Sequence, residues 1–224
     1  MACETMVTAK ATNLPKGPSM RNQPALAVAG SAFLFACGGA VAPAPAAGTG
    51  TGGALPPSGT AFSLIEDGDM VMECDGVVHR FDLHGTGQLL VGDRVAGDTP
   101  TTVVTTESEQ LTGYDAELGT VTVSERGPAA GEFVAPGVGR AFPAAESFAQ
   151  DVAVAMDHSP CDNGQPAVYA SRSAFALLNT DLTSFPPKNA VYLLAEPVEL
   201  VDVTNPSAAS FTLTSFPVTV TQAP

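Results

Sequence analysis

The chain has 224 residues, of which 9 are Lys or Arg and 23 are Asp or Glu, so its formal charge is −14 at pH 7. This acidity predicts no nucleic-acid partner, because phosphate recognition needs a basic surface, and it also disfavours electrostatic docking on anionic lipid. Hydrophobic residues make up 45% of the sequence and charged residues only 14%, which indicates a folded domain rather than a disordered chain.

The first distinctive segment is an apolar run from Ala25 to Ala36, which follows the basic residue Arg21. A secretory signal has a positive start, an apolar stretch of roughly 7–15 residues and a cleavage site made of small residues. The run is shorter than the roughly 20 residues that a membrane-spanning helix needs. We therefore predict that residues 1–36 are an export signal, within which residues 1–19 precede a second plausible start at Met20.

The end of this run, Leu34-Phe35-Ala36-Cys37, resembles the lipobox of bacterial lipoproteins. The resemblance implies cleavage before Cys37, diacylation of its sulfur and a lipid anchor in the cell membrane or outer membrane, with an envelope protein as a conceivable partner. Phe35 departs from the family pattern, in which a small residue is usual. The alternative is a secreted soluble protein, cleaved at one of the Ala-x-Ala sites between Ala40 and Ala46.

The remainder divides into a tether and one β domain. Residues 37–60 consist almost wholly of Gly, Ala, Pro, Thr and Ser after Cys37, a composition typical of a flexible linker. Residues 61–224 contain alternating β-branched segments such as Thr120–Ser124 and Val218–Thr221, separated by Gly, Pro, Asn and Asp. The pattern predicts an all-β domain, a single β-sandwich or barrel of roughly ten short, mostly antiparallel strands.

Among these segments we expect strands at residues 70–74, 77–83, 89–91, 101–106, 152–156, 168–171, 191–194, 198–203 and 211–214. The stretch Ala144–Met156 fits a short helix or a strand, and alternation of Val152, Val154 and Met156 favours the strand.

Two cysteines, Cys74 and Cys161, lie in the β domain, each beside turn residues. Exported proteins meet an oxidising environment in which paired thiols become disulfides. We therefore predict a Cys74–Cys161 bridge, with two buried free thiols as the alternative.

A soft-metal site is a second interpretation of the same region. Met70 and Met72 share a strand face with Cys74, and His158 lies three residues before Cys161. Thioethers and thiolates select Cu(I), and imidazole suits copper or zinc. Alternating methionines are equally what a core-facing strand contains, and a disulfide would remove both thiolates, so these residues are weak candidates for a metal site.

Other chemistry finds less support. Glu66-Asp67-Gly68-Asp69 concentrates carboxylates but lacks the EF-hand spacing, so we expect a solvated turn rather than a calcium loop. Asp157-His158-Ser159 contains the residue types of a catalytic triad, but adjacent residues seldom converge in space. We predict no catalytic residue and no cofactor.

Three functions are consistent with this sequence. The first is a non-enzymatic cell-envelope lipoprotein with a binding or structural role, the second an exported protein that binds a metal or small ligand, and the third a hydrolase on a β scaffold. A concave pocket with convergent His, Asp or Glu side chains would favour the second or third, and a filled core the first.

Overall fold

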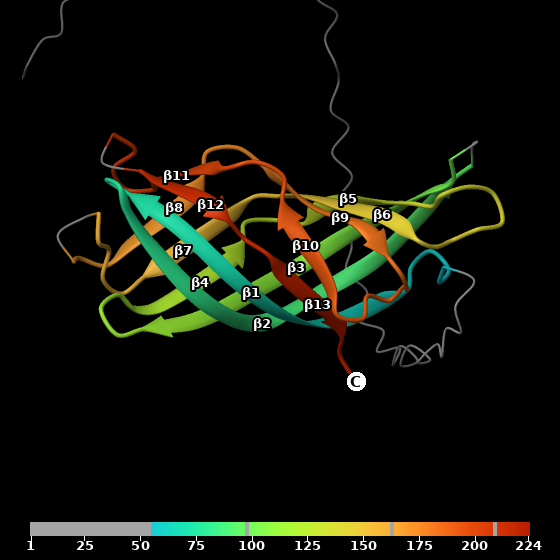
Figure 1. The fold of residues 1–224 in the computed structure, drawn as a ribbon, viewed down its shortest axis with the longest axis horizontal. Coiled ribbons are helices and arrows are strands. Elements are labelled where there is room, and N and C mark those ends of the chain that lie inside the picture. Colours follow the sequence, from blue (N-terminus) through green and yellow to red (C-terminus); the bar gives the residue numbers. More distant parts are fainter. Residues whose placement is uncertain (1–54, 97–98, 162–163, 208–209) are drawn as a thin grey trace, which may run out of the picture. The chain divides into compact units, whose positions relative to one another are not determined.

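The structure is a computed structural model that describes residues 55–96, 99–161, 164–207 and 210–224. Every regular element in these ranges is a β-strand, and the strands form one sheet that closes on itself (Figure 1). In chain order they are β1 (Ala61–Cys74), β2 (Val77–Val95), β3 (Thr101–Asp115), β4 (Gly119–Glu125), β5 (Ala129–Val134), β6 (Ala144–Gln150), β7 (Val152–Met156), β8 (Ala167–Ser171), β9 (Phe175–Leu182), β10 (Ala190–Leu194), β11 (Val198–Asp202), β12 (Phe211–Ser215) and β13 (Val218–Gln222). The all-β, barrel-like prediction is confirmed, with 13 strands in place of roughly ten.

The barrel has eight positions around its circumference, filled in chain order by an antiparallel up-and-down meander. β1, β2 and β3 each fill one position alone. Each of the other five holds two consecutive strands in tandem: β4 with β5, β6 with β7, β8 with β9, β10 with β11, and β12 with β13. Both members of each tandem pair bond to the neighbouring position, and β12 and β13 close the ring on β1.

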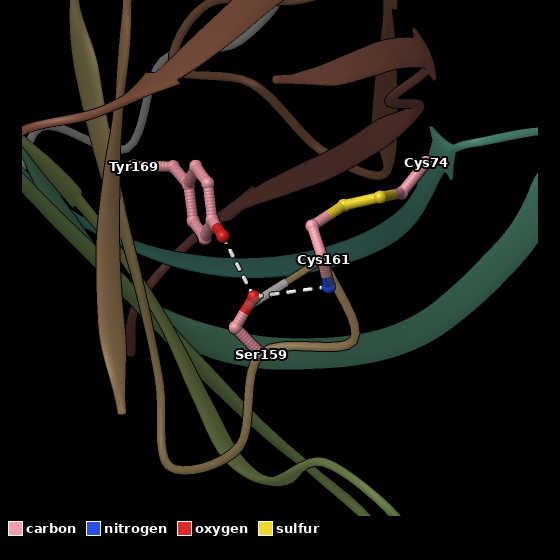
Figure 2. Close-up of a disulfide and its surroundings, with 4 residues drawn as sticks. All are labelled: Cys74, Ser159, Cys161 and Tyr169. Atoms are coloured by element: carbon pink, nitrogen blue, oxygen red, sulfur yellow. Dashed lines mark hydrogen bonds between the residues drawn. A yellow bond between two sulfur atoms is a disulfide. The ribbon is translucent and has the colours of Figure 1, made fainter. Parts of the chain in front are cut away.

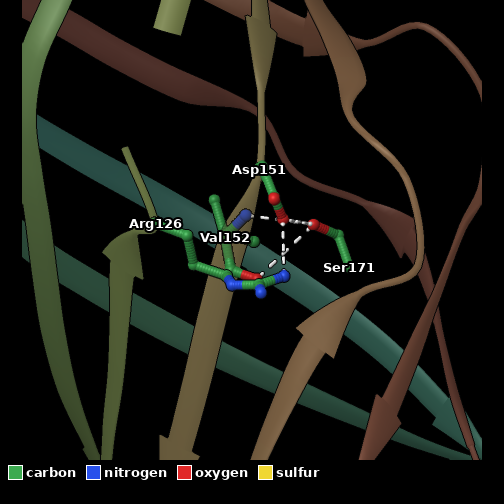
Figure 3. A network of polar contacts seen from close by, with 4 residues as sticks. All are labelled: Arg126, Asp151, Val152 and Ser171. Carbon is green, nitrogen blue, oxygen red and sulfur yellow. Dashed lines mark hydrogen bonds and ion pairs between the residues drawn. The ribbon is translucent and has the colours of Figure 1, made fainter. Parts of the chain in front are cut away.

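Three of the interruptions between tandem strands, at β4–β5, β6–β7 and β8–β9, are joined by polar contacts (Figure 3). Arg126 Nη1 lies 3.1 Å from Asp151 Oδ1, and the same carboxylate oxygen accepts a 2.6 Å hydrogen bond from Ser171 Oγ. Ser171 Oγ in turn accepts a 3.0 Å bond from the Val152 backbone N–H. Three neighbouring positions of the barrel are therefore tied together where their ladders are broken.

Aromatic side chains fill the end of the barrel that carries the β5–β6 and β9–β10 connections. Phe185 packs edge-on against Phe62 and Phe133, with ring centroids 5.8 and 5.7 Å away, and Phe142 packs against Phe133 at 5.7 Å. Because Phe142 and Phe185 lie in the two connections, they hold these loops over the barrel end.

The opposite end is held by the predicted disulfide (Figure 2). Cys74 ends β1 and Cys161 lies in the β7–β8 connection, with their Cα atoms 6.2 Å apart. Ser159, fully buried, shares a 2.6 Å hydroxyl hydrogen bond with Tyr169 and accepts a 3.2 Å bond from the Cys161 N–H. Tyr169 packs edge-on against Phe211 at 4.7 Å, so this connection is fixed to the core.

The structure corrects two expectations. Glu66-Asp67-Gly68-Asp69 is not a solvated turn, because it lies within the long strand β1, with Glu66 facing inward and Asp67 outward. The strands are also not uniformly short, since β1, β2 and β3 have 14, 19 and 15 residues. The Ala144–Met156 stretch forms β6 and β7, as expected. The described residues contain no helix long and apolar enough to cross a membrane.

Candidate functional site

A partly enclosed cavity lies inside the barrel, near the level of the strand interruptions. The empty space here is about 370 Å³ when the part open to solvent is included, and about 30 Å³ is enclosed enough to hold the centre of a water molecule. The walls are mainly apolar and carry a small set of polar groups. The lining residues are Leu64, Leu89, Phe148, Leu177, Pro187, Val218 and Val220, with Glu66, Thr106, Glu109, Gln150 and Tyr192.

Glu66 reaches the cavity because β1 alternates strictly, burying every second residue from Phe62 to Met70. Its carboxyl group occupies space that Gly87 of β2 leaves open. A Cβ atom at Gly87 would lie 2.4 Å from Glu66 Oε1, closer than nonbonded atoms approach. The glycine on β2 therefore makes the position of this carboxyl group possible.

Glu109 reaches the cavity from β3 because of an irregularity in the β2–β3 ladder. Gln88 pairs with Ser108 and Leu89 with Thr106, so Glu107 is an extra residue in β3. Such a bulge reverses the alternation, which lets both Thr106 and Glu109 face inward. Gln150 of β6 donates a 2.5 Å hydrogen bond from Nε2 to Glu109 Oε2.

Burial and mutual repulsion raise the pKa values of these carboxyl groups. Desolvation, with added repulsion from Glu109 and Glu125, raises the pKa of Glu66 to about 9. Desolvation raises the pKa of Glu109 to about 7, opposed by its hydrogen bond from Gln150. Desolvation and the Glu109 charge raise the pKa of the half-buried Glu125 to about 8. The two carboxyl groups that line the cavity, those of Glu66 and Glu109, therefore keep their protons to higher pH than an exposed glutamate does.

A further buried carboxyl group, that of Glu146, lies next to the cavity-lining residue Tyr192. The Tyr192 hydroxyl, on β10, donates a hydrogen bond to Glu146 Oε2 on β6. Desolvation raises the pKa of Glu146 to about 7, against the lowering effect of this bond. Burial and the nearby Glu146 charge raise the pKa of Tyr192 far above its usual range, so this phenol stays a hydrogen-bond donor.

Several oxygens at the cavity have no hydrogen-bond partner within the protein. They are Glu66 Oε2, Glu109 Oε1 and Gln150 Oε1, all on side chains that are at least nine-tenths buried. Buried polar atoms are nearly always paired, so unpartnered ones at a cavity indicate a place for water or a ligand. When protonated, these carboxyl groups can donate hydrogen bonds, and when ionised they can bind a cation.

Cys37 and the lipobox-like segment fall outside the described residues. The three weak metal candidates do not line the cavity. Met70 and Met72 are buried in the core, and His158 is exposed, with its Nδ1 3.2 Å from the Gly164 carbonyl. No group of three or more His, Cys, Asp or Glu side chains in the described part of the chain is arranged to hold a metal ion.

Sequence reasoning missed most of the cavity's polar residues. A signal existed for Glu146 and Gln150, because they alternate with buried residues between Ala144 and Val152. Glu66 gave the same signal, because it occupies an inward position in the alternating strand β1. None existed for Glu109, because strict alternation from Val104 places it on the outer face, and only the irregularity at Glu107 turns it inward.

The sequence matches no protein-family model. It also matches no curated protein. Among solved structures, the fold is similar to that of DynF from the dynemicin biosynthesis pathway of Micromonospora chersina. The TM-score is 0.59 at 20% identity, and the match covers 74% of this chain and 82% of DynF. At this identity the similarity establishes a shared fold.

Proposed function

We propose that this chain is an exported, non-enzymatic binding protein whose barrel holds a small, largely apolar ligand. The observation that carries the proposal is the interior cavity, whose apolar walls surround oxygens of Glu66, Glu109 and Gln150 that lack partners within the protein. Ligand sites typically combine apolar walls with a few placed polar groups.

The fold supports the same function. Eight-stranded barrels are wide enough to enclose side chains or one small ligand. The aromatic cluster and the disulfide-linked connection cover the two barrel ends, which would shield a ligand from water. DynF, which has a similar fold, comes from the dynemicin biosynthesis pathway. In this proposal residues 1–36 would export the barrel, and an acylated Cys37 with the tether of residues 37–60 would hold it near the membrane.

The test is binding of 1-pentanol, a neutral probe of a few heavy atoms, to the full-length chain carrying Cys37→Ala. Titration followed by NMR should show saturable shifts confined to methyl groups lining the cavity, such as those of Leu89 and Val220. Val218→Phe, which fills the cavity, should weaken binding at least tenfold. The matched control is Val191→Phe on β10, where the valine side chain is exposed.

Equal binding by wild type and Val218→Phe would contradict the proposal, as would the absence of any saturable shift. If Val218→Phe does not fold, Val218→Leu provides a smaller increase in volume, and the same comparison is made with Val191→Leu.

A further inference from the structure

We propose that the cavity selects a small aliphatic amine, bound as the ammonium ion between the side chains of Glu66, Glu109 and Gln150. This inference rests on the proposed function, because it names the ligand class of the same cavity. It starts from a charge imbalance. All six Lys and Arg residues in the described ranges are exposed: Arg80, Arg94, Arg126, Arg140, Arg172 and Lys188.

The interior acids therefore have no cationic partner from the described chain. Two of those cations, Arg126 and Arg172, pair with Asp151 and Glu199 at the surface. Carboxyl groups are rarely fully buried unless they are paired or bind a cation, because desolvation of the charge is costly. A ligand that brings a positive charge would remove that cost, whereas an anionic ligand would increase it.

The unpartnered atoms match an ammonium group in number. A primary ammonium has three N–H donors and no acceptor. Glu66 Oε2, Glu109 Oε1 and Gln150 Oε1 supply three acceptors at the cavity. An alcohol has one donor to offer, so it can satisfy only one of these oxygens. The alkyl chain of the amine would lie against Leu89, Leu177 and Val218.

Binding of the ammonium ion would release a proton. The titratable groups that face Glu66 are Glu109 on β3, Glu125 on β4 and Tyr192 on β10, behind which lies Glu146. In the empty cavity at neutral pH, Glu66 is held as the neutral acid. When the ammonium enters with its three N–H groups intact, the carboxylic O–H breaks, its proton passes to solvent, and the carboxylate pairs with the cation.

The experiment compares n-pentylamine, 1-pentanol and pentanoate on the full-length Cys37→Ala chain by NMR titration. At pH 8 the amine should bind at least tenfold more tightly than the alcohol, and pentanoate should bind more weakly than both. Between pH 6 and 8 the amine association constant should rise by up to about tenfold per pH unit, because each binding event releases about one proton. The alcohol should not show this rise.

Glu109→Gln should remove most of the difference between the amine and 1-pentanol affinities, and Glu132→Gln, an exposed position on β5, should leave both affinities unchanged. Equal affinity for amine and alcohol, or tighter binding of pentanoate, would overturn the inference and leave the proposed function standing. Absence of binding by all three probes would overturn both. Amine binding that persists unchanged in Glu109→Gln would also overturn the inference.

Discussion

Glu66 has an environment that favours its neutral form. The side chain is 3% exposed, and the charges nearest to it are those of other acids. Desolvation and like-charge repulsion both oppose ionisation, so the folded protein binds protons more tightly than the unfolded chain. Glu109, Glu125 and Glu146 share this behaviour in direction. The stability of the protein is therefore linked to pH through its interior.

The sign of that linkage gives a first prediction. The pKa of Glu66 is about 9 in the folded state against 4.5 as its ordinary value, so its contribution is fully present below pH 4.5 and is lost as pH rises toward 9. We expect the free energy of unfolding to fall between pH 5 and 9, by an amount on the order of several kcal/mol. Glu66→Gln should flatten this dependence in urea denaturation measured at each pH.

The matched control is Glu73→Gln, which changes an exposed glutamate on the same strand and should keep the wild-type slope. An unchanged slope in Glu66→Gln, or stability that increases with pH in the wild type, would show that Glu66 is not held neutral.

Tyr192 gives a second prediction. Its hydroxyl is the hydrogen-bond donor to Glu146, whose other oxygen has no partner within the protein. Tyr192→Phe would leave both carboxyl oxygens of a buried side chain unpaired, which typically costs about 1–3 kcal/mol. The exposed Tyr114, at 79% accessibility, provides the control, since Tyr114→Phe should change the unfolding free energy by less than about 0.5 kcal/mol. Equal effects of the two substitutions in urea denaturation would disprove the role of this bond.

At this scale the sequence was informative only where alternation held. Glu66 and Glu146 occupy inward positions of regular strands, so a polar residue at an apolar position was visible in principle. Glu109 was not, because an unpaired residue in β3 decides its direction. Convergence of the three strands on one cavity depends on closure of the barrel, which no local pattern encodes.

Some of the strands could also be predicted from the sequence and others could not. Segments rich in β-branched residues, such as Thr120–Ser124 and Val218–Thr221, form strands as predicted. β5, with the sequence AAGEFV, was not predicted as a strand because Ala and Gly have low strand propensity. Its pairing with β3 and β6 stabilises it instead. The full length of β1 was not predicted either, because Asp67-Gly68-Asp69 has the composition of a turn.

The disulfide links two distant elements, the end of β1 and the β7–β8 connection, across a sequence separation of 87 residues. Closing a loop of this size constrains the unfolded chain, and loss of such a bridge typically costs about 2–5 kcal/mol. In a chain carrying Cys3→Ser and Cys37→Ala, we expect Cys74→Ser with Cys161→Ser to lower the unfolding free energy by that amount. Urea denaturation with and without reductant measures it.

An internal control accompanies this test, because reductant should lower the stability of the parent chain to that of the double variant and leave the double variant unchanged. Two reactive thiols in the unreduced, denatured parent chain would contradict the bridge.

For the whole molecule, composition and turn spacing predicted an all-β sandwich or barrel, but they did not decide between these two forms. Closure follows from pairing of β12 and β13 with β1, contacts between the two ends of the domain. The sequence also shows that the chain is acidic. Only the structure shows that the described Lys and Arg residues are exposed while several Glu residues are buried.

Location in the cell is a property of the whole chain and gives the last prediction. Cleavage before Cys37 would remove three of the nine basic residues and one of the 23 acidic residues, leaving a formal charge of −16. A chain this acidic is repelled by anionic lipid, so stable membrane attachment would depend on the acyl chains. We expect the wild type to incorporate labelled fatty acid and to partition into the detergent phase. Cys37→Ala should abolish both, and Cys3→Ala should abolish neither. Wild-type protein found wholly in the aqueous phase, with a mature N-terminus between Pro43 and Ala47, would instead establish free secretion.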